Sequence, residues 1–126
     1  MVVQHKPRRV AIFDVDGTIF RSSLLIELME GLVDAGTFPK SARTEYSMSL
    51  SRWRDRKGTY DNYIEAVVKS FMKNIRGVYY GDFMEVAKEV TALHQNRVYR
   101  YTRDLLKKLK KQGYFLLAIS QSPKSV

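Results

Sequence analysis

Apolar and polar residues are arranged in two different patterns along this chain. Short apolar runs at Val10–Phe13 and Tyr114–Ile119, rich in β-branched and aromatic residues, are typical of buried strands. Between these runs, apolar residues recur every three or four positions, which predicts helices. The predicted helical segments run from about 23 to 36, 39 to 56, 60 to 75, 82 to 93 and 102 to 113.

The order of these elements is a strand, four helices that form a compact bundle, a fifth helix and a second strand. A helix that leads into a second strand favours a right-handed crossover, so we expect this strand to lie parallel to the first. The four earlier helices then form an insertion between the first strand and the fifth helix.

The composition excludes several classes of chemistry. The 126 residues are enough for one ordinary domain and include no cysteine, which rules out disulfides, thiolate zinc sites and cysteine nucleophiles. His5 and His94 do not form a metal-binding spacing. Two aspartates interrupt the apolar residues between Val10 and Phe20, so this stretch is neither a signal peptide nor a membrane span. We therefore expect a cytoplasmic protein that does not engage a membrane.

The formal net charge of +9 favours anionic partners such as phosphorylated substrates, nucleic acid or acidic surfaces. The simplest interpretation of the basic residues is a solvated helix face, because most of them lie on predicted helices or at helix ends. No nucleic-acid-binding motif accompanies them, so a nucleic-acid partner is not expected. The two main clusters are Arg52, Arg54, Arg56 and Lys57, and Lys107, Lys108, Lys110 and Lys111.

The most informative stretch is Asp14-Val15-Asp16-Gly17-Thr18, directly after the first apolar run. Side chains two residues apart in a strand point the same way, so Asp14 and Asp16 enter one site. Two acids this close favour a bound cation or a retained proton. Gly17 permits a sharp turn, and Thr18 adds a hydroxyl. The alternative interpretation is a strand that ends in an Asx-rich turn, but this does not explain Asp14.

These residues resemble the first motif of the haloacid dehalogenase-like (HAD) phosphohydrolase superfamily, a hydrophobic strand followed by Asp-x-Asp-Gly-Thr. The segment Phe115–Ser120 resembles the second motif, a hydrophobic strand that ends in Ser or Thr. The resemblance implies hydrolysis of a small phosphorylated substrate through an aspartyl-phosphate. In that reaction Asp14 is the nucleophile, and Asp16 is the general acid and then the base.

The same resemblance implies Mg²⁺, held by the Asp14 carboxylate and the Asp16 backbone carbonyl. Mg²⁺ would offset the repulsion between the aspartates and an incoming phosphate. Backbone amides of the loops after the two strands suit the phosphoryl oxygens. The candidate phosphate-binding residues are Ser120, Gln121, Thr18 and Gly17.

The fold implied by the resemblance is α/β, with a partial Rossmann-like parallel sheet core made of residues 1–22 and 97–126. Residues 23–96 then correspond to a helical cap like that of the phosphoserine-phosphatase-like branch. Caps of this kind cover the site and select the substrate.

Two features depart from the pattern of that branch. Arg21-Ser22-Ser23 stands where phosphoserine phosphatases have an acidic residue that reads the substrate amine, which argues against phosphoserine as the substrate. The superfamily's later lysine and acids are also missing, and Lys124 lies too close to Ser120 to be that lysine. We therefore expect the N-terminal portion of a HAD-type phosphatase, weakly active or inactive by itself.

Two other functions fit parts of the pattern. A catalytically inactive, basic helical module would bind nucleic acid or a protein partner through its charge. A phosphoacceptor receiver-like domain also uses aspartates and Mg²⁺, but it predicts no large helical insertion after the first acidic pair. Because two strands do not make a stable sheet alone, self-association through an exposed sheet edge is also expected.

Overall fold

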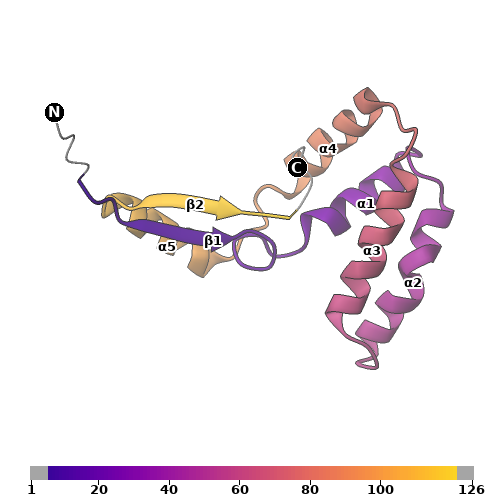
Figure 1. Cartoon of the computed structure of the whole chain (residues 1–126), viewed down its shortest axis with the longest axis horizontal. Helices are drawn as coiled ribbons and strands as arrows, with labels where there is room; N and C mark the ends of the chain where they lie inside the picture. The colour runs from indigo at the N-terminus through magenta and orange to yellow at the C-terminus, as the bar shows by residue number, and fades with distance from the viewer. Residues whose placement is uncertain (1–5, 122–126) are drawn as a thin grey trace. The chain divides into compact units, whose positions relative to one another are not determined.

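The computed structural model describes residues 6–121, and its elements follow in the predicted order (Figure 1). The sequence pattern identified each of them, although α4 and α5 each begin two residues before their predicted starts. The elements are strand β1 (Val10–Asp14), helices α1 (Leu24–Asp34), α2 (Ser41–Arg54), α3 (Tyr60–Asn74), α4 (Tyr80–His94) and α5 (Arg100–Lys111), and strand β2 (Phe115–Ile119).

The two strands pair in parallel, as the crossover argument predicts. Their register places Val10 beside Phe115 and Asp14 beside Ile119, so both strands end at the same edge of the sheet. Helix α5 packs against β2 on one side of the strands (Figure 1). Gly113 has a φ of +78° in the turn between α5 and β2, a conformation that glycine adopts without a Cβ clash.

The predicted fold class, an α/β protein with a partial Rossmann-like sheet core, is wrong. Within residues 6–121 the structure is mostly helical, with five helices and a parallel sheet of only two strands. A Rossmann-like core needs an open sheet of several parallel strands with helices on both faces. The apolar runs identified the strands correctly, but the fold class was extrapolated from the resemblance to strands that this part of the chain does not contain.

The described residues divide into two compact units. The sheet unit comprises residues 6–22 and 96–121, and therefore holds β1, α5 and β2. The helical unit comprises residues 23–95 and holds α1 to α4.

The helical unit has its own hydrophobic core, to which all four helices contribute. Helix α1 contacts α2, α3 and α4, and α2 packs along α3. Gly31 allows the close approach of α1 and α4, because a Cβ added there would lie 2.5 Å from a Val90 methyl. The largest fully buried side chains are Tyr46, Phe38, Leu28, Met29, Leu32 and Val67.

A polar network links α1 to α2 at the border of this core. The Tyr46 hydroxyl donates to Glu30 Oε1 at 2.5 Å, and the Arg43 guanidinium donates to Glu30 and Asp34. Burial, and then the hydrogen bond to Glu30, raise the pKa of Tyr46 above its usual range. Every buried side-chain polar atom of the described residues has a hydrogen-bond partner. The network therefore joins α1 to α2 at the edge of the core.

Candidate functional site

The predicted site residues lie at the carboxyl end of the two-stranded sheet. Asp14 is the last residue of β1, beside Ile119, and the Val15 amide continues the ladder by donating to the Ile119 carbonyl at 3.1 Å. Ser120 and Gln121 follow directly after Ile119. The register therefore brings Asp14, Asp16 and both residues after β2 to one edge. This is the edge at which parallel sheets of α/β proteins bind ligands.

Exposure differs between the two aspartates. Asp14 is exposed, whereas Asp16 is half-buried and lies in a short parallel bridge with Phe20. Ser120 and Gln121 are exposed. Asp14 is thus accessible from solvent, as a nucleophile must be, and the loop after it fixes the backbone of Asp16.

The loop after β1 is held by its own backbone. The Val15 carbonyl accepts hydrogen bonds from the amides of Thr18, Ile19 and Phe20, at 3.3, 3.0 and 2.9 Å. The Gly17 amide donates to the Phe20 carbonyl at 2.9 Å, and Gly17 has a φ of +76°. A residue with a Cβ is strained in that conformation, which gives the glycine of the motif a physical reason.

This geometry changes the roles expected of two predicted phosphate-binding residues. The amides of Gly17 and Thr18 already donate to carbonyls inside the loop. The exposed Thr18 hydroxyl therefore suits a ligand better than either amide does. Glycine's contribution at position 17 is to the shape of the loop.

Thr102, which was not predicted as a site residue, anchors the loop. Its hydroxyl donates to the Thr18 carbonyl at 2.8 Å, and the Thr102 side chain is buried. Nearby, the Tyr99 amide donates to the Ile19 carbonyl at 2.9 Å. The sequence did contain a signal for this role. Thr102 precedes the three leucines of α5 by three, four and seven residues, so its hydroxyl lies on the apolar face of that helix.

A second connection joins the loop to the segment before α5. The Arg21 amide donates to the Arg97 carbonyl at 2.8 Å, and Phe20 forms an antiparallel bridge with Val98. The Arg97 guanidinium lies 6.0 Å from the Phe20 ring centroid. The Arg21 guanidinium lies 6.0 Å from the Tyr99 ring centroid, so an arginine approaches an aromatic ring on each side of this connection.

The positive charge of the protein is concentrated in the sheet unit. Residues 6–22 and 96–121 contain eleven Lys or Arg and three Asp or Glu, whereas residues 23–95 contain ten of each. The helical unit is therefore formally neutral, and the unit that carries Asp14 and Ser120 has most of the excess. Such a field raises the local concentration of anionic ligands.

The donor set at this edge fits Mg²⁺. Mg²⁺ prefers oxygen ligands, and it is commonly bound by one or two carboxylates together with substrate phosphate and several waters. Asp14 supplies a carboxylate and Asp16 a backbone carbonyl oxygen. Residues 6–121 contain no group of three or more His, Cys, Asp or Glu side chains that could enclose a metal. Lys124 lies outside the described residues.

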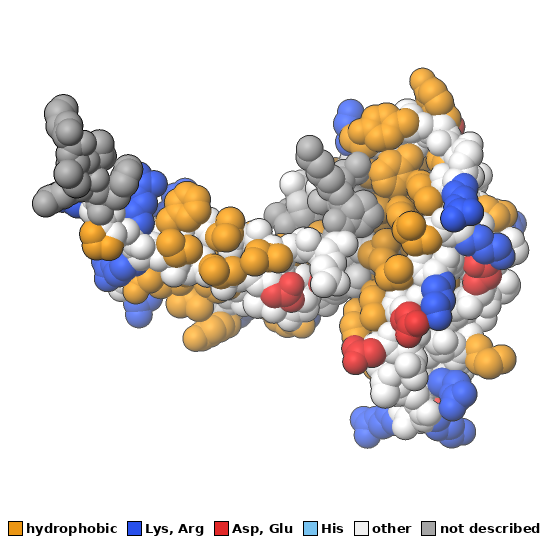
Figure 2. All heavy atoms as spheres, viewed as in Figure 1, with side chains coloured by type: hydrophobic (Ala, Val, Ile, Leu, Met, Phe, Trp, Pro, Cys, Tyr) orange, Lys and Arg blue, Asp and Glu red, His pale blue; other side chains and the backbone are white. Residues whose placement is uncertain are grey.

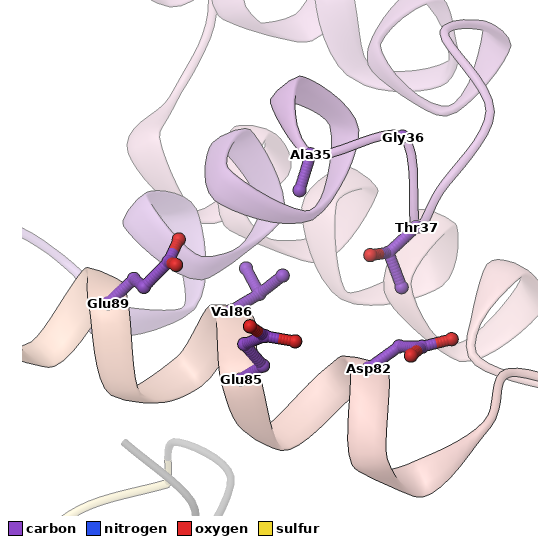
Figure 3. A pocket seen from close by; sticks show the side chains of 7 residues that line it. All are labelled: Ala35, Gly36, Thr37, Asp82, Glu85, Val86 and Glu89. Carbon is purple, nitrogen blue, oxygen red and sulfur yellow. The ribbon is translucent and has the colours of Figure 1, made fainter.

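The helical unit contains a separate shallow hollow of about 320 Å³ between the turn after α1 and helix α4 (Figure 3). Its acidic lining disfavours a phosphate ligand, because like charges repel. The lining residues are Ala35, Gly36, Thr37, Asp82, Glu85, Val86 and Glu89.

Comparison of the chain with protein-family models, with curated proteins and with solved structures gave no match. Of the helices described within residues 6–121, none combines the length and apolarity needed to cross a membrane.

Proposed function

We propose that the protein is a Mg²⁺-dependent phosphohydrolase that transfers the phosphoryl group of a small phosphate ester to Asp14. The observation that carries this proposal is the parallel register of β1 and β2, which sets the exposed Asp14 at the same sheet edge as Ser120. The proposal agrees with the resemblance of both strand ends to the HAD superfamily motifs. A cytoplasmic location for this activity remains a prediction.

The first half of the reaction forms a covalent intermediate. A carboxylate oxygen of Asp14 attacks phosphorus, the bond from phosphorus to the ester oxygen breaks, and Asp16 gives its proton to the departing oxygen. In the second half, Asp16 takes a proton from a water molecule, whose oxygen attacks the phosphorus of the aspartyl-phosphate. Inorganic phosphate leaves, and the Asp14 carboxylate and the protonated Asp16 are regenerated.

The remaining residues of this edge position the phosphoryl group. The hydroxyls of Ser120 and Thr18 are hydrogen-bond donors for its oxygens, and Gln121 offers an amide directly after Ser120. Bound Mg²⁺, held by the Asp14 carboxylate and the Asp16 carbonyl, would offset negative charge at the reacting phosphate. The positive sheet unit favours the approach of an anionic substrate.

The test follows the first half-reaction, which requires no turnover. The chain is incubated with Mg²⁺ and acetyl phosphate, quenched in acid and weighed by intact mass spectrometry. We expect one phosphoryl adduct that hydroxylamine removes, as it removes acyl phosphates. Asp14→Asn should form no adduct. Asp16→Asn should form it, because acetate leaves acetyl phosphate without being protonated. It should also retain it, because the hydrolysis step loses its general base, and general acid–base catalysis typically accelerates such steps by about 10²–10⁴-fold.

Asp104→Asn is the matched control, because Asp104 is an exposed aspartate of the same unit that pairs with Arg103. It should label like the wild type. An adduct of wild-type yield in Asp14→Asn would refute Asp14 as the nucleophile.

A binding module for anionic partners is a second candidate function, favoured by the concentration of positive charge in the sheet unit. It predicts an affinity for oligonucleotides that falls steeply with salt and is unchanged in Asp14→Asn. Phosphoryl labelling that depends on Asp14 would decide for the hydrolase.

A further inference from the structure

One face of the two-stranded sheet is apolar and exposed. Alternate residues of each strand point to this face, and the register sets Val10 beside Phe115 and Ile12 beside Leu117. Their exposed fractions lie between 43% and 62%, well above those of core residues. We call this surface the open sheet face, made of Val10, Ile12, Phe115, Leu117 and Ile119. Figure 2 shows hydrophobic side chains along this part of the molecule.

The other face of the sheet is the one that α5 covers. Of the intervening strand residues, Ala11, Phe13 and Leu116 are partly buried and Ala118 is exposed, and the leucines of α5 are partly buried. The four lysines near the end of α5 are exposed. These four lysines and the open sheet face therefore belong to opposite layers of the unit. The only charged side chain that the alternation within β1 and β2 adds to this face is Asp14, at its end.

We propose that two copies of this chain associate through their open sheet faces. The result is a two-fold symmetric sandwich of two sheets, with each α5 on the outside. Such a contact is isologous, so the open sheet face of one copy meets the same face of the other. Pairing of sheet edges alone would leave both apolar faces in water. The inference is independent of the proposed function.

The area of the face argues for a weak dimer. The five side chains are each about half exposed, and a large apolar side chain offers roughly 200 Å², which gives on the order of 500 Å² per copy. Two copies then bury about 1,000 Å² in total, the lower end of specific interfaces. We therefore expect an association that depends on protein concentration rather than a permanent dimer. Asp14 falls at the polar rim of this interface.

The charge distribution favours a second copy over a membrane as the occupant. Binding to an anionic bilayer needs cations and apolar residues on the same side, whereas the four lysines of α5 lie on the layer opposite the open sheet face. In the sandwich the two sheets lie about 10 Å apart, with each α5 one layer further out. The two basic helices are then separated by more than the screening length of about 8 Å at physiological salt, so their repulsion opposes the contact only weakly.

The test is sedimentation velocity of the 126-residue chain over a wide range of concentrations. The weight-average mass of the wild type should rise toward that of a dimer. Ile12→Lys should raise the dissociation constant at least tenfold, because it places a charge at the centre of the face. Leu93→Lys is the matched control, since Leu93 is a 77% exposed leucine of the helical unit, and it should behave as the wild type.

A second measurement keeps the inference testable if Ile12→Lys fails to fold. The sequence has no cysteine, so a single introduced cysteine reports unambiguously. Leu117→Cys should form an intermolecular disulfide under mild oxidation, and Leu93→Cys should not. A wild type that stays monomeric at every concentration, an equal effect of Leu93→Lys, or a series of species larger than dimers, as edge pairing produces, would each overturn the inference.

Discussion

The hydrogen bond between Thr102 and the Thr18 carbonyl gives the sharpest test of how the motif loop is held. Thr102→Val keeps the volume of the side chain and removes only the hydroxyl, so the Thr18 carbonyl loses a donor 2.8 Å away. Removing one partner of a buried hydrogen bond costs about 1–3 kcal/mol. Because Thr18 itself is exposed and water can partly replace the donor, we expect a loss of about 1–2 kcal/mol for opening of the loop.

Native-state hydrogen exchange measures this loss directly at two amides. The Tyr99 amide donates to the loop at Ile19, and the Gly17 amide donates within the loop, so both should exchange faster once the anchor is gone. A loss of 1–2 kcal/mol corresponds to a reduction of protection by about 5–30-fold.

Thr44→Val is the matched control for this experiment. The Thr44 hydroxyl also donates to a backbone carbonyl, that of Ser41 at 2.7 Å, but both residues are exposed on α2. Its effect on stability should stay within about 0.5 kcal/mol. Unchanged protection of Tyr99 and Gly17 in Thr102→Val, or an equal loss in Thr44→Val, would show that the hydroxyl does not hold the loop.

Three further substitutions test the helical unit. Gly31→Ala should destabilise it by up to about 2 kcal/mol despite alanine's better helix propensity, because the new Cβ would lie 2.5 Å from a valine methyl of α4. Gly81→Ala should stabilise it by up to about 1 kcal/mol, since the new Cβ meets only the exposed, flexible ring of Tyr79. Urea unfolding followed by the fluorescence of the single tryptophan distinguishes the two variants. Equal shifts in their unfolding free energies would contradict the packing explanation. The hydrogen bond from Lys73 is the main cause that lowers the pKa of Glu45 below its ordinary value of 4.5. The pair therefore stabilises the fold fully above pH 4.5, and this contribution is lost as the pH falls through the lowered pKa. Unfolding free energies measured against pH should therefore fall less steeply on the acid side in Glu45→Gln, and parallel curves would contradict the assignment.

The sequence by itself determined the local structure and the ends of the strands. Apolar periodicity located both strands and all five helices within residues 6–121, because burial of one face is a local property of each segment. The chirality of the connection fixed the parallel pairing. Once the strands are parallel, Asp14 and Ser120 must share an edge, since each residue is placed by the end of its own strand. The chemistry assigned to these residues remains a prediction.

Only the tertiary structure decided how the loop is anchored and which surfaces stay open. Thr102 and Thr18 are 84 residues apart, and no local pattern specifies a hydrogen bond between them. The amide of Gly17 appeared suited to phosphate from its motif, yet the folded loop uses it internally. The uncovered side of the sheet was equally beyond the sequence pattern. Periodicity shows which side of a strand is apolar, but what covers that side depends on the packing of segments far apart in the chain.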